Sequence, residues 1–204
     1  MRVLLLALVL MASPVAAQQL IDYELLFAQN ADRVVTTTDV EGGVHRTLRM
    51  PGEVTLTCSS DGCHGWDMGA EGPVGCIWDL AMALRAVAEV CAFPSDTQEG
   101  LAVVHGRLSA FVAENAVPPR PVTDLEAFYL DQVAAYRDGD AHEEALDCDS
   151  VSRQESDVGI MIAAMIAALL AQPSPLAKFE EADTFDLDAL LATPRLPVMQ
   201  PCGY

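Results

Sequence analysis

Hydrophobic and polar residues alternate with a period of two between positions 34 and 58. Residues 44–50 place Val, Arg, Leu and Met at every second position, and residues 54–58 do the same with Val, Leu and Cys. The breaks at Glu41-Gly42-Gly43 and at Pro51-Gly52 fit tight turns. The pattern therefore predicts a three-stranded antiparallel β-meander over about residues 34–58.

From Gly75 onward the period becomes helical. The residues that share a stripe at i, i+3, i+7, i+10 and i+14 are apolar, while Arg85 and Glu89 form an i, i+4 pair elsewhere on the same helix. Capping boxes at Ser95 to Gln98, Thr123 to Glu126 and Ser152 to Glu155 predict three further helix starts. Short helices are expected at 19–31 and 185–192, and an acidic helical turn at 140–147. The stripe of the first long helix consists of Ile77, Leu80, Leu84, Val87 and Cys91.

The segment from Val158 to Ala171 holds fourteen residues without a polar side chain. It is too short to cross a bilayer, which needs about 20 apolar residues. We expect a helix that is buried on all sides, and a protein-binding or oligomer surface is the alternative, because small residues and Met suit close packing. The fold class that follows is α+β. It is mainly helical, with about five helices over residues 75–193, a small N-terminal antiparallel β-meander and stabilising disulfides.

The N-terminus has the three parts of an export signal. A positive start at Arg2 precedes ten apolar residues, and Val15 and Ala17 occupy the −3 and −1 positions of a cleavage site. Residues 1–17 are therefore expected to be removed. The remaining residues 18–204 are expected to form one exported domain without a membrane span, in the periplasm or secreted.

The charge balance narrows the possible partners. The chain has 30 Asp and Glu against 11 Lys and Arg, a formal net charge of −19. Duplex nucleic acid and anionic membranes attract clustered Lys and Arg, so neither is an expected partner. A hydrophobic content of 51% supplies enough apolar mass for a core. Strong acidity would instead steer the chain to a basic partner, and we expect a protein of the cell envelope.

All six cysteines follow the cleavage site, which in an exported chain predicts a disulfide framework. Cys76 and Cys91 flank one helix and are too far apart to pair with each other. We expect Cys58 and Cys63 to bond to these two in some order. The same reasoning leaves Cys148 to bond Cys202.

The segment Cys58-Ser59-Ser60-Asp61-Gly62-Cys63-His64 also has a chemical alternative. It resembles a longer variant of the Cys-x-x-Cys-His attachment signature of c-type haem. The resemblance implies thioether bonds at Cys58 and Cys63, with His64 as the proximal iron ligand and Met68 or Met82 as the distal one. Against it, the same residues are ordinary turn chemistry at the end of a strand, with both cysteines in disulfides.

The remaining polar clusters have weaker patterns. His64 with Asp61 and Asp67 offers a metal site, but groups in a Gly-rich loop are usually solvated. Residues 138–144 gather four carboxylates and His142 without the spacing of a calcium loop, and a capped helix start accounts for them. His105 lies beside an apolar stripe, where a core histidine is a commoner explanation than a catalytic base. We expect no metal site and no catalytic residue.

These observations favour a periplasmic or secreted binding or accessory protein that acts through protein–protein contacts, without a cofactor. In general architecture, the stretch from Cys91 to Cys148 resembles small cysteine-paired periplasmic helical proteins, including some toxin-immunity types. Two alternatives remain at this point. One is a monohaem electron carrier that uses Cys58, Cys63 and His64, with covalent haem c as its cofactor. The other is a hydrolase with a dispersed site around His64, Asp67, His105 or Glu143.

Overall fold

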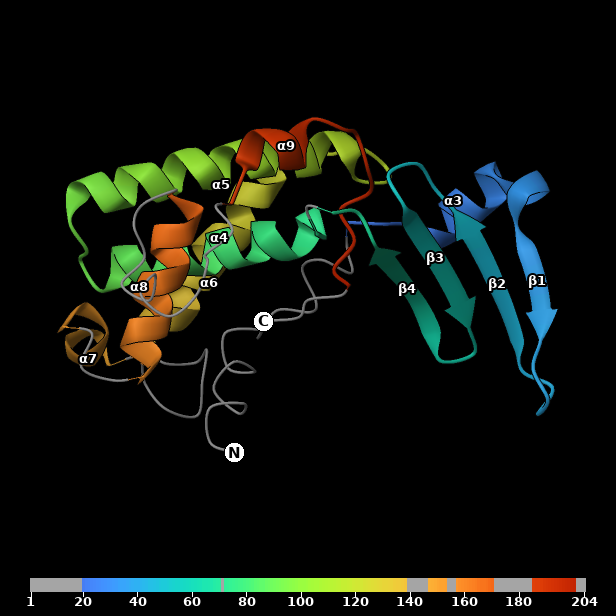
Figure 1. Cartoon of the computed structure of the whole chain (residues 1–204), viewed down its shortest axis with the longest axis horizontal. Coiled ribbons are helices and arrows are strands. Elements are labelled where there is room, and N and C mark those ends of the chain that lie inside the picture. Colours follow the sequence, from blue (N-terminus) through green and yellow to red (C-terminus); the bar gives the residue numbers. More distant parts are fainter. Residues whose placement is uncertain (1–19, 71, 139–146, 154–156, 171–184, 201–204) are drawn as a thin grey trace.

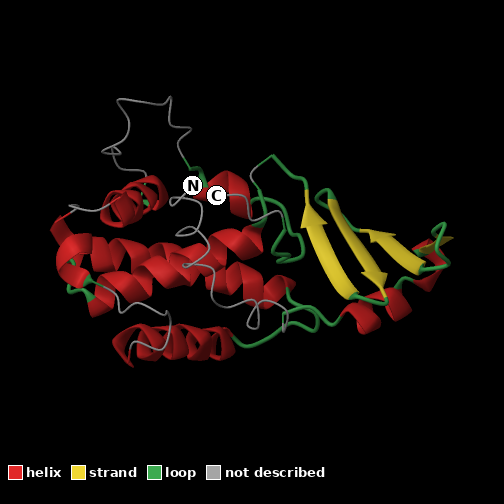
Figure 2. Ribbon diagram, turned by 90° about the horizontal axis from the view of Figure 1, so that it is seen from below, coloured by secondary structure: helices red, strands yellow, loops and turns green. Residues whose placement is uncertain are grey.

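A computed structural model describes residues 20–70, 72–138, 147–153, 157–170 and 185–200. The predicted signal segment, His142 and Glu143, and most of the acidic turn lie outside these residues. Within them, helices form one lobe and a β-sheet lies beside it (Figures 1 and 2). The expected fold class, a mainly helical α+β protein with a small antiparallel sheet near the N-terminus and disulfides, is confirmed.

The sheet has four antiparallel strands in the order β1-β2-β3-β4, so the three-stranded prediction was one strand short. The missing strand, Gly62–Asp67, has glycines at two of its six positions and therefore lacks a clear hydrophobic alternation. Its register with the preceding strand places Cys58 opposite Cys63 and Leu56 opposite Gly65. The strands are β1 (Val35–Thr38), β2 (Val44–Arg49), β3 (Val54–Ser59) and β4 (Gly62–Asp67).

The inner face of the sheet is covered by α3 (Tyr23–Gln29), which is followed by the short 3₁₀ helix η2 (Ala31–Arg33). Leu48 of β2 and Leu56 of β3 are fully buried on this face, where they join a core cluster that also contains Phe27 of α3. Burying such side chains is the main force that holds a short sheet in place. In Figure 1 α3 lies behind the strands, and no described helix lies in front of them.

The helical lobe is built around α4, which packs against both α5 and α6. Trp78 and Leu84 of α4 are fully buried, because a helix between two neighbours buries most of its circumference. One continuous cluster of buried hydrophobic residues draws on both the helices and the sheet. The helices are α4 (Val74–Val90), α5 (Ser95–Asn115), α6 (Val122–Asp138), α7 (Cys148–Arg153), α8 (Asp157–Leu169) and α9 (Leu187–Leu191).

Periodicity located these helices to within a few residues, but the capping boxes predicted at Ser95 and Thr123 were wrong, and the box from Ser152 to Glu155 extends outside the described residues. Ser95 and Thr123 are already inside their helices, and Pro94 is the N-cap of α5. The side chain of Gln98 donates instead to the carbonyl of Phe93. Asp22 and Asp186 do cap α3 and α9 through their carboxylates.

The apolar helix α8 is not buried on all sides, contrary to the prediction. Its buried residues are Gly159, Ile162, Ile166, Ala167 and Leu169, whereas Met161 and Met165 are only half-buried and Ala168 is exposed. The described residues contain no helix long and apolar enough to cross a membrane.

Two disulfides join cysteines that the prediction had assigned to other partners. Cys58 bonds to Cys63 across β3 and β4, with a Cα–Cα distance of 4.0 Å. Cys91, at the end of α4, bonds to Cys148 at the start of α7. Cys76 is also disulfide-bonded, and Cys202 lies outside the described residues. The expected bond between Cys148 and Cys202 is therefore wrong, because Cys91 already occupies Cys148.

A C-terminal strap, residues 194–200, fills the seam between the sheet and the helices. It fits because two glycines leave room for it. A Cβ atom on Gly65 of β4 would overlap Cγ1 of Val198, and one on Gly75 of α4 would lie 2.5 Å from the Val198 carbonyl oxygen. The strap also pairs with β4 through a backbone bond from Asp67 to the carbonyl of Gln200.

Candidate functional site

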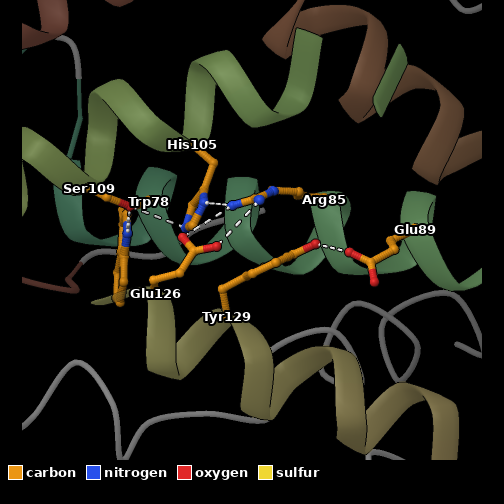
Figure 3. A network of polar contacts seen from close by, with 7 residues as sticks. All are labelled: Trp78, Arg85, Glu89, His105, Ser109, Glu126 and Tyr129. Carbon is orange, nitrogen blue, oxygen red and sulfur yellow. Dashed lines mark hydrogen bonds and ion pairs between the residues drawn. The ribbon is translucent and has the colours of Figure 1, made fainter. Parts of the chain in front are cut away.

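A chain of polar contacts lies between α4, α5 and α6, and it contains the histidine that the sequence marked as a possible base (Figure 3). His105 of α5 is completely buried. Its Nδ1 lies 2.9 Å from Nη1 of Arg85, and its Nε2 lies 3.3 Å from Oγ of Ser109, one helical turn further along α5. Nε1 of Trp78 also donates to Oγ of Ser109, at 3.0 Å.

The contact with Arg85 fixes the tautomer of the imidazole. A guanidinium has only donors, so Nδ1 of His105 has to accept. The proton of the neutral ring is then on Nε2, which donates to Ser109. A serine nucleophile needs the opposite arrangement, in which the histidine accepts the hydroxyl proton. The pair therefore acts as a structural contact and does not form an activated serine.

Burial, together with the smaller effect of the positive charge of Arg85, lowers the pKa of His105 to about 4. The imidazole is consequently neutral at pH 7, as its role as an acceptor from Arg85 requires. The rings of Trp78 and His105 face each other at 20° with centroids 6.4 Å apart. A charged imidazole here would lie beside a second cation in an apolar environment.

Arg85 connects His105 to residues of α6. Its two terminal nitrogens each lie 3.4 Å from a carboxylate oxygen of Glu126 on α6, and its guanidinium carbon lies 3.7 Å from the centre of the Tyr129 ring. The hydroxyl of Tyr129 donates to Glu89, which also pairs with Arg137 at 3.4 Å. Arg85 and Glu89 thus bond to α6, and not to each other as their i, i+4 spacing predicted.

The sequence identified His105 but missed Arg85 and Ser109 as its partners. The i, i+4 spacing of His105 and Ser109 on one helix was the available signal for Ser109. The choice of Arg85 depends on how α4 and α5 pack, which their separate periodicities do not specify.

The other candidate residues do not gather around this network. His64 lies on β4 opposite Thr57, exposed on the sheet, whereas His105 lies inside the helical lobe. Asp67, two residues beyond Gly65 on the inner face, is almost completely buried and contacts Arg195 of the strap at 3.4 Å. No group of His, Cys, Asp and Glu in the described part of the chain is arranged to hold a metal ion.

The predicted haem segment forms the β3–β4 hairpin. Cys58 and Cys63 are joined to each other there, and thioether attachment of a haem would need both of these thiols. His64 follows Cys63 along β4. The haem hypothesis remains a prediction, and a mass measurement is suited to test it.

A different feature stands out on the uncovered outer face of the sheet. Trp66 of β4 is 42% exposed there, and the register aligns it with Thr55 of β3 and Arg49 of β2. Side chains at register partners lie on the same face of a sheet, so the guanidinium and the indole flank one hydroxyl. The neighbouring row runs through Val35, Thr47, Thr57 and His64.

The outer face differs in charge from the rest of this acidic chain. The four strands contain one carboxylate, Asp67, and it faces inward. Arg49 is exposed and forms no ion pair with any described residue, in contrast to Arg46 on the inner face, which pairs with Glu24. The outer face, defined by Arg49, Thr55, Trp66 and His64, is therefore an uncharged to basic surface on a protein of net charge −19.

Comparison with known proteins gives no match among family models, curated proteins or solved structures.

Proposed function

We propose that this chain is an exported, disulfide-bonded binding or accessory protein that acts through protein–protein contacts in the periplasm or outside the cell. The outer face of the sheet is its contact surface. Disulfides support export, because they persist in oxidising compartments. The proposal has no catalytic step and uses no cofactor.

The observation that carries this proposal is that exposed Trp66 and Arg49, which forms no ion pair with a described residue, lie on either side of Thr55 on a sheet face whose strands present no carboxylate. Trp and Arg are the residue types that most often dominate the binding energy of protein interfaces, whereas Asp and Glu are depleted there. A rigid antiparallel sheet presents both side chains at fixed positions, so little entropy is lost when a partner binds.

Capture experiments on variants test the proposal. The oxidised protein is immobilised and exposed to envelope extract, and Trp66→Ala and Arg49→Ala are compared with Leu130→Ala and Arg107→Ala. The two control residues are also exposed, but they lie on α6 and α5. A partner retained by the parent and both controls, and held at least about tenfold more weakly by the two sheet variants, supports the proposal. Equal capture by all four variants, or turnover of a substrate without capture, contradicts it.

A further inference from the structure

The two edges of the sheet are treated differently by the fold. The β4 edge is covered where the strap pairs with it, with Gln200 accepting from the backbone of Asp67. At the opposite edge, β1 is the outermost strand, and Figure 1 shows no described element beyond it. All four residues of β1 are exposed. Among the described elements, the sheet therefore ends in one uncovered strand.

The register shows which backbone groups of β1 point away from the sheet. Asp39 donates its backbone N–H to Gly43, which continues the β1–β2 ladder. Hydrogen-bonding residues alternate along an antiparallel strand, so Val35 and Thr37 also bond to β2. The N–H and C=O groups of Thr36 and Thr38 point outward, and no described residue bonds to them.

β1 also lacks most of the features that usually prevent pairing at an edge. Its sequence is Val-Thr-Thr-Thr, with no charge and no proline, and its register with β2 runs one to one without a bulge. Natural sheets normally protect an exposed edge with a very short strand, lysine, proline, a bulge or a covering segment, and of these features β1 has only its short length of four residues. A short edge rich in β-branched residues and without the other features is suited to accept another strand.

We infer that the β1 edge binds an extended, basic segment of a partner polypeptide, which adds to the sheet as a fifth strand. The inference rests on the proposed function and specifies the kind of partner. The spacing of the free hydrogen-bonding groups indicates what kind of molecule binds. The outward-pointing backbone N–H and C=O groups of Thr36 and Thr38 lie about 6.8 Å apart along the strand. An extended peptide backbone matches this ladder of alternating donors and acceptors.

The charge of the occupant follows from a hollow at the end of β1. This hollow, of about 330 Å³, lies between the β1–β2 and β3–β4 turns, and its walls include Asp39, Glu41 and Asp61. Asp39 and Glu41 follow β1 directly in the β1–β2 turn, so a Lys or Arg side chain near the end of the added strand would approach their carboxylates. Asp39 also contacts His45 at 3.0 Å, and Asp61 lies further away, in the turn between β3 and β4. The overall charge of −19 attracts a basic segment in the same way.

A second copy of this chain fits the edge less well. Four strand residues bury far less area than the roughly 1,200 Å² of a stable interface, and two copies of a chain with net charge −19 repel each other. A basic peptide has the opposite charge and can place side chains on both faces of the sheet beside β1.

Selection of peptides on the full oxidised protein tests the inference. The probe is a library of random ten-residue peptides, displayed and selected for binding. The selected peptides are expected to alternate β-branched and polar residues and to contain Lys or Arg. Thr36→Pro and Thr38→Pro should weaken their binding at least about tenfold, because proline removes the outward N–H. Thr36→Val and Thr38→Val keep that N–H and should bind as the parent does.

Two further measurements keep the test decisive if a proline variant folds poorly. In the parent protein, the bound peptide should slow amide hydrogen exchange at Thr36 and Thr38 at least about tenfold. Glu41→Gln should weaken binding of the basic peptides, because Glu41 is exposed in the turn next to β1, while the exposed Asp131→Asn on α6 should not. Failure to select peptides, unchanged exchange at both amides, or equal binding to well-folded proline variants overturns the inference. So does a dimer of the parent that both proline variants abolish, since it would make a second copy the occupant.

The outcomes also separate this inference from the proposed function. Suppose that capture of an envelope partner depends on Trp66 and Arg49 and is unchanged in well-folded Thr36→Pro and Thr38→Pro. The β1 edge is then not the binding site, and the outer face is supported as the contact surface. Suppose instead that peptide binding is lost in the two proline variants and that capture is unchanged in Trp66→Ala and Arg49→Ala. The outer face is then not the contact surface, and the β1 edge is supported as the binding site.

Discussion

The Nη1 atom of Arg85 lies 2.9 Å from Nδ1 of His105, in the buried seam between α4 and α5. The donor and acceptor roles in this contact have one consistent assignment, with Arg85 donating to a neutral imidazole. It connects the packing of three helices to the protonation state of one side chain, because Arg85 also reaches Glu126 on α6.

Replacing Arg85 with Gln should raise the pKa of His105 above its present value of about 4. The substitution removes a positive charge beside the ring. Burial is the larger cause of the low pKa, so the new value should still fall below 6.5. NMR titration of the imidazole measures it. An unchanged or lower pKa would show that Arg85 does not act on His105 as described.

The same variant should be less stable at pH 7 by about 1–2 kcal/mol, since it loses part of the network to His105 and Glu126. Arg107→Gln is the control, because its ion pair with Asp188 is exposed and should be worth less than about 1 kcal/mol. The lowered pKa of His105 means that the unfolded state protonates first. The contribution of neutral His105 to the stability of the parent is therefore complete above pH 6.5 and is lost as the pH falls through about 4.

Asp79→Asn should stabilise the protein at neutral pH. Asp79 is half-buried on α4 and forms no ion pair with a described residue, and burial raises its pKa from 3.8 to about 6. The folded state thus favours the protonated acid. The contribution of protonated Asp79 to stability is present below pH 3.8 and is lost as the pH rises through about 6. We expect a gain of about 1–3 kcal/mol in urea unfolding at pH 7 and little gain at pH 4.

The exposed Asp131→Asn is the control for this substitution and should change stability little at either pH. A gain for Asp79→Asn that is larger at pH 4 than at pH 7 would contradict the assignment of a desolvated carboxyl group.

Two helical glycines should respond to alanine in opposite directions. Gly75→Ala places a Cβ 2.5 Å from the Val198 carbonyl oxygen and 2.7 Å from that of Pro197, so the strap has to move. We expect a loss of more than about 2 kcal/mol. Gly106→Ala has open space around its Cβ within α5 and should gain about 0.5–1 kcal/mol. Thermal unfolding compares the two variants. A Gly75→Ala variant as stable as the parent would show that the strap does not pack closely against Gly75.

Intact mass before and after reduction tests export, oxidation and haem attachment together. Protein recovered from the periplasm should have the mass of residues 18–204 and gain about 6 Da on reduction, as three disulfides require. Peptide mapping without reduction should recover the Cys58–Cys63 and Cys91–Cys148 links. The added mass of a covalent haem would instead assign Cys58, Cys63 and His64 to electron transfer.

Local patterns were sufficient for elements whose residues have one clear partner face. The apolar stripe through Leu80, Leu84 and Val87 predicted α4, and the alternation at Val54 and Leu56 predicted β3, because each pattern reflects direct burial. β4 was missed for the opposite reason. Gly65 faces the core there, and the apolar group that fills its place is Val198, distant in the sequence.

The disulfides and the polar sites required information of another kind. The hairpin register places Cys58 opposite Cys63, and the fold brings Cys91, at the end of α4, to Cys148 at the start of α7. The spacing of the cysteines along the chain favoured other disulfide pairs, because it does not show which strands are neighbours in the sheet. Likewise, no local signal separates the ion-paired Arg46 from Arg49, which forms no ion pair with a described residue, although the two are only three positions apart.

The sequence by itself determined the mainly helical α+β class, the approximate positions of most elements, the strong negative charge and the presence of cysteines able to form disulfides. Propensity and periodicity are properties of a few neighbouring residues, so a single chain displays them. The tertiary structure decided the tautomer of His105, the disulfide partners, the strap between Gly65 and Gly75, and the bare edge at β1. Each of these depends on contacts between residues far apart in the chain, which form only when the elements pack.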